Sequence, residues 1–289
     1  MDFKNAKELL DLCNTHNLSI SEVMIEREIQ LGETTAEIID QKMSRVLEIM
    51  KDAAFLPIQN PVKSMGGLIG GEAEKLSLHH ASCKSLCGDL LEKAVTYAMA
   101  TLETNASMGL IVASPTAGSA GIVPGLLLAL QKIYDFSDAQ VKKALFNASA
   151  IGYLAMRNAT VAGAVGGCQA ETGIASAMAA SAAVELMGGT ALQCTYAAST
   201  VLMNMLGLVC DPVGGLVEYP CQNRNASGVA NALVAAELAL AGITQLIPLD
   251  EMIATMYAVG KKIPAELRET ALGGCAITPS ACEACHMCS

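Results

Sequence analysis

Apolar side chains recur at intervals of three and four residues along most of the chain, a spacing that places them on one face of a helix. The pattern is clear over residues 36–53, AEIIDQKMSRVLEIMKDA. No segment shows the sustained two-residue alternation of a strand bounded by hairpin turns. The chain is therefore predicted to be all-α. Further helices are expected over residues 89–103, 121–134, 138–156, 170–187, 190–207, 225–241 and 249–259.

Three capping boxes mark expected helix starts. They are SISE at residues 19–22, TTAE at residues 34–37, and the pair Ser137 and Gln140. In such a box the side chain of the cap residue accepts a hydrogen bond from the backbone N–H three residues later. The side chain of that later residue accepts one from the backbone N–H of the cap residue. Each box precedes an apolar periodic run, which strengthens the prediction of a helix.

Four glycine-rich segments separate the expected helices. They are SMGGLIGGEAEK (64–75), ASPTAGSAGIVPG (113–125), VAGAVGGCQAE (161–171) and CDPVGGLVEYPCQNRNASG (210–228). Glycine adopts backbone angles closed to other residues and lets a ligand approach the main chain. These segments predict either tight helix packing with turns or a ligand site, and we favour the site.

Composition and charge exclude two classes of partner. The chain is 52% hydrophobic but only 3% aromatic, so Ala, Gly and aliphatic residues must form its core. Its most apolar stretches are interrupted by polar residues before reaching the roughly 20 residues that a membrane span requires. The net charge of -10 argues against a nucleic-acid or anionic-membrane partner.

Eleven cysteines in an acidic chain whose start, MDFKNAKELLDL, lacks a signal-peptide pattern predict a reducing cytoplasm. Cys13, Cys83, Cys87 and Cys194 are interpreted as ordinary apolar or surface thiols.

Cys168, Cys210 and Cys221 lie in the glycine-rich segments, 42 and 11 positions apart, a spacing that matches no compact zinc motif. They fit either a metal site assembled from separate loops or three buried structural thiols.

The chain ends in CEACHMCS, where Cys282, Cys285 and Cys288 follow a Cys-x-x-Cys-x-x-Cys spacing. The Cys-Pro that completes a bacterial ferredoxin run is missing. A zinc site from Cys275 and the tail cysteines or His286 remains an alternative. We interpret the tail as a lid, a reserve ligand or a disordered end.

Several of these segments together resemble one family. NASMGLIVASPTAGSAGIVPG (105–125), GGCQAETGIASAMAA (166–180), CDPVGGLVEYPCQNRNASGVANA (210–232), the SMGGLIGGEAEKL loop and GGCAITPSAC are similar to the iron–sulfur L-serine dehydratases, specifically the α subunit of the two-subunit bacterial form. The resemblance covers nearly the whole chain. It implies an Ala/Gly-rich helical catalytic domain whose glycine-rich loops surround a [4Fe–4S] cluster on Cys168, Cys210 and Cys221.

The resemblance also implies a reaction and a partner. An iron with an open coordination position would act as a Lewis acid in converting L-serine to pyruvate and ammonia. No pyridoxal phosphate is expected, since only Lys63 and Lys75 lie near a glycine-rich segment and that cofactor needs a Schiff-base lysine. The family's Ser-Ser-Ser-His-Thr loop is absent here, so a β subunit is expected to supply the base. The catalytic base of this chain is left unassigned.

Small polar residues among the glycines are expected to bind the substrate, and Arg224 offers a fork that matches a carboxylate. The predicted substrate-binding residues are Ser64, Asn105, Ser107, Thr116, Gly118, Ser119 and Arg224. In some members of the family the chain terminus is thought to enter the active site, so Cys288 or Cys285 is the predicted tail ligand. His79 and His80, in SLHHASCK, are expected in an exposed turn.

We expect the chain to consist of a helical segment packed on the core (1–60), a catalytic domain (61–274) and a Cys-rich tail (275–289). Two alternative functions stay open. One is another iron–sulfur β-eliminating lyase, such as an L-cysteine desulfidase. The other is a non-enzymatic iron–sulfur redox or sensor protein.

Overall fold

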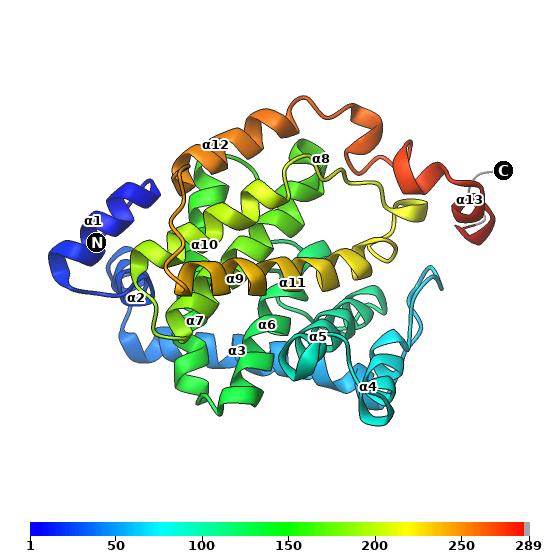
Figure 1. Ribbon diagram of the computed structural model, residues 1–289, viewed down its shortest axis with the longest axis horizontal. Coiled ribbons are helices and arrows are strands. Elements are labelled where there is room, and N and C mark those ends of the chain that lie inside the picture. Colours follow the sequence, from blue (N-terminus) through cyan, green and yellow to red (C-terminus); the bar gives the residue numbers. More distant parts are fainter. Residues whose placement is uncertain (286–289) are drawn as a thin grey trace.

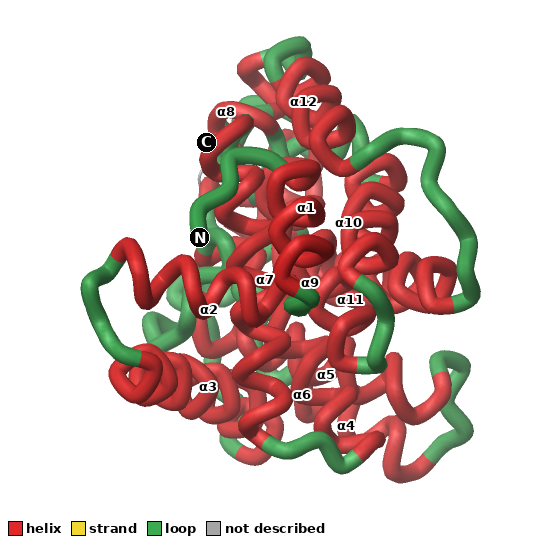
Figure 2. Tube along the Cα trace, turned by 90° about the vertical axis from the view of Figure 1, so that its left-hand side faces the viewer, coloured by secondary structure: helices red, strands yellow, loops and turns green. Residues whose placement is uncertain are grey.

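Helices supply nearly all the regular structure of the protein, as Figure 2 shows. The computed structural model describes residues 1–285. Within that range there is no strand, and one isolated bridge pairs Cys210 with Arg268. The prediction of an all-α fold is confirmed. None of the helices in these residues is both long and apolar enough to cross a membrane.

The α-helices run in chain order as follows: α1 (Ala6–His16), α2 (Ile20–Leu31), α3 (Ala36–Gln59), α4 (Glu72–Ser82), α5 (Gly88–Ala106), α6 (Ile122–Tyr134), α7 (Asp138–Asn158), α8 (Gly163–Gly166), α9 (Ile174–Leu186), α10 (Ala191–Asn204), α11 (Cys221–Leu240), α12 (Leu249–Gly260) and α13 (Pro279–Cys285). The short helical turns are η1 (Ala117–Ser119), η2 (Gln169–Gly173), η3 (Val213–Gly215), η4 (Ala265–Leu267) and η5 (Gly274–Ile277).

Two of the three predicted capping boxes are confirmed. Ser19 with Glu22 and Ser137 with Gln140 each make both reciprocal bonds. The box at residues 34–37 is wrong by one position. Thr35 is the cap of α3 and accepts from the Ile38 N–H, which leaves Glu37 one residue too early to reach back.

Helix α9 forms the centre of the molecule. Every residue from Ile174 to Val184 is buried, and α7, α10, α11 and α6 pack around this helix. Figure 1 shows α9 among these neighbours, with α1 and α13 at opposite ends of the long axis. Its Ala and Ser side chains allow backbones to approach closely, so a core with few aromatic residues still packs densely.

The contact between α5 and α6 depends on two glycines. A Cβ atom on Gly121 would lie 2.2 Å from the carbonyl oxygen of Ala98, and one on Gly125 would lie 2.8 Å from that of Ala94. Neither oxygen can yield without moving the α5 backbone. Glycine is therefore required here by close approach rather than by its backbone angles.

Replacing Gly121 with alanine is expected to lower the free energy of unfolding by about 1–3 kcal/mol, the usual cost of an overpacked core. Gly173→Ala is the matched control, because its Cβ would meet nothing closer than 3.7 Å. Its backbone is already helical, so the control should be neutral or slightly stabilising. Denaturant unfolding of the two variants measures the difference, and equal losses would refute the packing argument.

The first three helices pack onto the rest of the chain. Helix α2 lies against α7, and α3 lies against α5. The carboxylate of Asp250, in α12, accepts hydrogen bonds from the first backbone N–H groups of α1, at Ala6 (2.7 Å) and Lys7 (3.1 Å). The proposed division at residues 60 and 274 stays a prediction.

The expected turn at His79 and His80 is wrong, since both residues lie in the last turn of α4. His79 is exposed, whereas His80 is half-buried and its Nδ1 lies 2.9 Å from Glu92. Helix α4 begins after Gly71, which offers no side-chain cap, so the sequence carries no start signal there.

Candidate metal centre

Two of the three predicted cysteine ligands meet in the interior. Cys168, which precedes the π-helical turn η2, is 4% exposed, and Cys210 is 3% exposed. Hydrogen bonding from Cys210 lowers the pKa of the Cys168 thiol, and Thr172, whose hydroxyl is 2.9 Å from this sulfur, lowers it further. The same contact and burial raise the pKa of Cys210. Cys168 is therefore the thiol of the pair that loses its proton first.

Cys221 is the first residue of α11 and is half-buried. Burial raises the pKa of its thiol to about 12, and the charges of Cys168 and Glu171 act in the same direction. The positive end of the helix dipole lies at this position and favours an anionic group. The helix predicted over residues 225–241 is present and starts earlier, at Cys221. Cys210, in contrast, is followed by a loop and the short turn η3.

The backbone of Cys210 is held on both sides by the segment 267–269. Its N–H donates to the Leu267 carbonyl (2.8 Å), and its carbonyl accepts from the Glu269 N–H (2.7 Å). This pairing brings Glu269 to the site. One ligand atom from each of Glu171, Cys210 and Glu269 lies within 4.8 Å of the other two.

Glu171 joins the thiols to a second glycine-rich segment. Its Oε2 accepts from the Cys210 Sγ at 3.6 Å, and its Oε1 accepts from the Thr116 hydroxyl at 2.8 Å. Burial raises the pKa of this carboxyl. A Cβ on Gly163 would lie 2.4 Å from Glu171 Oε2 and 3.0 Å from the Cys210 sulfur, so only glycine lets the α8 backbone approach this group.

Arg224 is the positive charge of the site. Its Nη2 lies 2.6 Å from Asp211 Oδ1, and its Nη1 donates to the Val209 carbonyl at 3.0 Å. Although burial lowers the pKa of Arg224, the charges of Cys168 and Asp211 raise it above its ordinary value. The guanidinium in turn lowers the pKa of Cys168, in the same direction as the larger effect of the hydrogen bond from Cys210. It also lowers the pKa of Cys221, against the larger effect of burial.

Besides Arg224, three of the predicted substrate residues lie beside this centre, namely Thr116, Gly118 and Ser119. Thr116 contacts Glu171, and its hydroxyl is 3.1 Å from that of the buried Ser119. Asn225 of α11 fixes the segment, because its Nδ2 donates to the Gly118 carbonyl (2.7 Å) and its Oδ1 accepts from the Gly121 N–H (3.0 Å).

The other predicted substrate residues lie elsewhere. The Ser64 hydroxyl, 7% exposed, donates to Glu218 and accepts from the Ile69 N–H, so it is already engaged. Ser107, at the end of α5, donates to the Thr104 carbonyl. Asn105 is half-buried in the last turn of the same helix.

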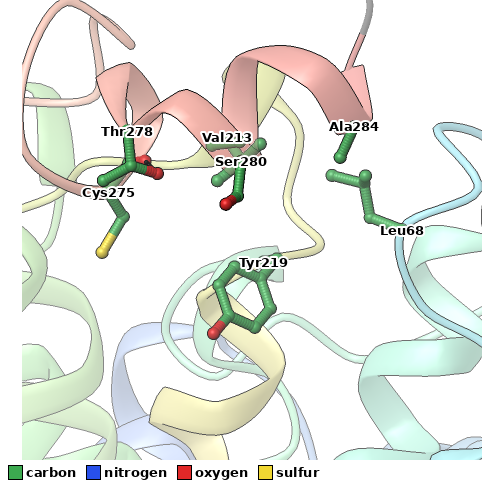
Figure 3. Close-up of a pocket in the computed structure, with 8 residues that line it drawn as sticks. Leu68, Val213, Tyr219, Cys275, Thr278, Ser280 and Ala284 are labelled. Carbon is green, nitrogen blue, oxygen red and sulfur yellow. Dashed lines mark hydrogen bonds between the residues drawn. The ribbon is translucent and has the colours of Figure 1, made fainter.

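A pocket of about 480 Å³ borders the segment that carries Cys210 and Cys221, and Val213 and Tyr219 of this segment line it. In Figure 3, Tyr219 faces α13 across it, with Cys275 and Leu68 on its two sides. The backbone N–H of Cys275 donates to Asp211 Oδ2 at 2.6 Å, which ties this wall to the residue after Cys210.

The structure describes the tail only as far as residue 285. Cys285 lies in α13, where its thiol points to the Cys282 carbonyl at 3.8 Å. Cys288 and His286 lie outside the described residues. Within the described range, Cys275, Cys282 and Cys285 do not bring their sulfur atoms together as a metal group would. A tail ligand stays a prediction.

The donor set of the centre fits an iron–sulfur cluster. Thiols are the ligands that such clusters use. Cys168 and Cys210 are in contact here, and the charge of Cys168 acts on the third thiol, Cys221. The half-buried guanidinium of Arg224 and a helix N-terminus would offset the negative charge of the thiolates. If a cluster binds, Cys168, Cys210 and Cys221 would hold it, and Glu171 and Glu269 would lie beside it.

In the cluster-free chain, Cys221 is expected to react with iodoacetamide slowly at pH 8 and faster as the pH rises toward 12. With its pKa raised to about 12, only about one molecule in ten thousand carries the reactive thiolate at pH 8. Exposed Cys83 and Cys87 should be modified first. Peptide mass spectrometry after timed alkylation measures the rates. Equal rates at Cys221 and Cys83 would contradict the assigned burial.

Sequence reasoning missed the acidic residues of the site, namely Glu171, Asp211, Glu218 and Glu269. A usable signal existed for the first three. Each is an acidic residue inside an apolar, glycine-rich segment beside a cysteine, where burial with a partner was to be expected. Glu269 gave no such signal, since it is exposed and reaches Cys210 only through the bridge.

The fold and the site define an all-α protein in which two cysteines from separate glycine-rich segments are in contact, with a third nearby and with carboxyl groups beside them. The family model described as "Serine dehydratase alpha chain" matches residues 15–276, and the chain belongs to this family. It is 50% identical over 278 residues to the "Probable L-serine dehydratase, alpha chain" of Bacillus subtilis, covering 96% of this chain and 92% of that one. It is 46% identical over 271 residues to the "L-serine dehydratase, alpha chain" of Peptoniphilus asaccharolyticus, covering 94% and 93%.

A longer relative is also similar. The chain is 39% identical over 285 residues to the "L-serine dehydratase" of Helicobacter pylori. The match covers 96% of this chain but 62% of that protein.

Proposed function

We propose that this chain is the α subunit of an iron–sulfur L-serine dehydratase, a cytoplasmic lyase that converts L-serine to pyruvate and ammonia. The observation that supports the proposal is the contact of buried Cys168 and Cys210, with the charge of Cys168 acting on Cys221, in a chain 50% identical to a "Probable L-serine dehydratase, alpha chain". A cluster bound on these three thiolates would supply a Lewis-acidic iron that polarises the departing hydroxyl group.

The residues of this chain do the remaining work. Arg224 places a fixed positive charge beside the thiols and Asp211. Thr116 and Asn225 hold the 116–121 segment against Glu171 and α11. These contacts keep the small polar groups of the segment in fixed positions next to the centre. Burial of Cys168 and Cys210 excludes water from the sulfur atoms.

A β subunit is proposed as the partner. Two relatives are named as alpha chains, and the longer Helicobacter pylori protein has further length that this chain does not match. The base that removes the Cα proton is assigned to that subunit. No described histidine of this chain lies among the residues of the centre.

An anaerobic assay of the reconstituted protein with and without the β chain tests the function. L-serine should be the best substrate and should give pyruvate and ammonia in equal amounts, with little turnover by the α chain alone. L-threonine and L-cysteine are compared at equal concentration. Preference for L-cysteine, with sulfide as a product, would replace the proposal with the desulfidase alternative.

A further inference from the structure

Glu218 lies between two of the proposed cluster ligands, Cys210 and Cys221, yet its side chain points to a different part of the chain. It is 2% exposed. Its Oε2 accepts from the Ser64 hydroxyl at 2.6 Å and from the Leu68 N–H at 3.0 Å, and its Oε1 accepts from the Gly66 N–H at 2.6 Å. One carboxyl group thus satisfies three donors of a loop about 150 residues away in sequence.

The loop at residues 64–68, called here the glycine loop, has little else to hold it. Met65, Gly66 and Gly67 are exposed. One further hydrogen bond, from the Met65 N–H to the Ala106 carbonyl at 2.9 Å, joins the loop to α5. The three hydrogen bonds to the Glu218 carboxyl group are therefore the main attachment of the glycine loop. Without them, an exposed loop with so few contacts would open easily.

The same contact requires glycine at position 66. A Cβ at this position would lie 2.4 Å from Leu216 Cδ1, and 2.8 and 3.0 Å from the two carboxyl oxygens of Glu218. The glycine loop therefore approaches the 210–221 segment as closely as a backbone can. A side chain at Gly66 would push the two apart without removing Glu218.

The backbone of Glu218 is itself tied to α11. The Glu218 carbonyl accepts from the Gln222 N–H (2.9 Å) at the start of α11. Tyr219, the next residue, and Leu68, in the glycine loop, both line the 480 Å³ pocket. One carboxyl group thus fixes two walls of the pocket relative to each other.

We propose that Glu218 is a positioning residue of the dehydratase, which holds the glycine loop against the segment that carries Cys210 and Cys221 and thereby shapes the pocket for the substrate. The inference rests on the proposed function. Cys210 is held separately by residues 267–269, and Cys221 by α11. Loss of the tether therefore frees the loop and leaves the cysteines in place.

The test is Glu218→Gln in the reconstituted holoenzyme. The amide keeps the size of the side chain but turns an NH2 group toward donors, so at least one of the three hydrogen bonds is lost. Peptides spanning residues 61–71 should exchange their amide hydrogens at least roughly tenfold faster. The KM for L-serine should rise roughly tenfold, with a smaller change in kcat and unchanged iron per chain.

Gly66→Ala approaches the same contact from the loop side and should reproduce both effects. Glu185→Gln is the matched control. This carboxyl group also joins separate elements, accepting from Asn147 at 2.7 Å and from the Ser21 N–H at 3.3 Å, far from the glycine loop. It should leave exchange at residues 61–71 and the KM unchanged.

Unchanged exchange at residues 61–71 in Glu218→Gln would overturn the tether. Faster exchange with an unchanged KM would overturn its role for the substrate. Loss of iron from the variant would assign Glu218 to the metal centre instead. Absence of L-serine turnover in the unaltered holoenzyme would refute the proposed function alone, since hydrogen exchange reports on the tether without substrate.

Discussion

Replacing Cys168 with alanine is expected to remove iron and sulfide from the protein and to lower L-serine turnover by roughly 10²–10⁴-fold. The range corresponds to the several kcal/mol that a Lewis-acidic metal contributes to a transition state. Cys168 is the thiol of the site whose pKa is lowered, by hydrogen bonding from Cys210, so it is the proposed ligand most ready to bind as a thiolate. Iron and sulfide per chain, measured anaerobically, give the result.

Two other cysteines serve as controls for this change. Cys194 is fully buried away from the metal centre, and its sulfur contacts the side-chain amide of Asn147 at 3.8 Å. Cys194→Ala should therefore keep the cluster at a modest cost in stability. Cys285→Ala asks whether the tail contributes a ligand. A full complement of iron in Cys168→Ala, with loss in Cys285→Ala, would move the metal site to the tail.

The helices were largely predictable from the sequence because their signals are local. Helices α6, α7 and α12 begin and end within two residues of their predicted bounds, since periodic apolar positions mark them. Helix α11 begins four residues before the prediction, because its first turn, CQNR, shows no apolar periodicity. Helix α4 was missed because no side chain caps it.

The site was predictable only in part, for a physical reason. The glycine-rich segments and their cysteines are visible in the sequence, but which of them meet is decided by helix packing. The pairing of Thr116 with Glu171 joins positions 55 apart, and that of Ser64 with Glu218 joins positions 154 apart. No local pattern records a partner at such distances. The buried carboxyl groups and their donors therefore required the structure.

Replacing Arg224 with methionine is expected to destabilise the protein by about 3–5 kcal/mol and to lower its iron content. Asp211 is 2% exposed, and Arg224 lies 2.6 Å from it, so the change leaves an uncompensated charge in the interior. It also removes the positive charge that lowers the pKa of Cys168 and Cys221. Denaturant unfolding of the cluster-free chain and iron analysis of the assembled protein measure the two effects separately.

A second substitution separates the two roles of this arginine. In Arg224→Met with Asp211→Asn the unpaired charge is gone, so much of the lost stability should return. The iron content should stay low, because the thiolates still lack their positive neighbour. Lys7→Met, which breaks the exposed pair with Asp11, is the control and should change neither quantity. Recovery of iron together with stability would mean that Arg224 acts on the metal centre only by keeping the chain folded.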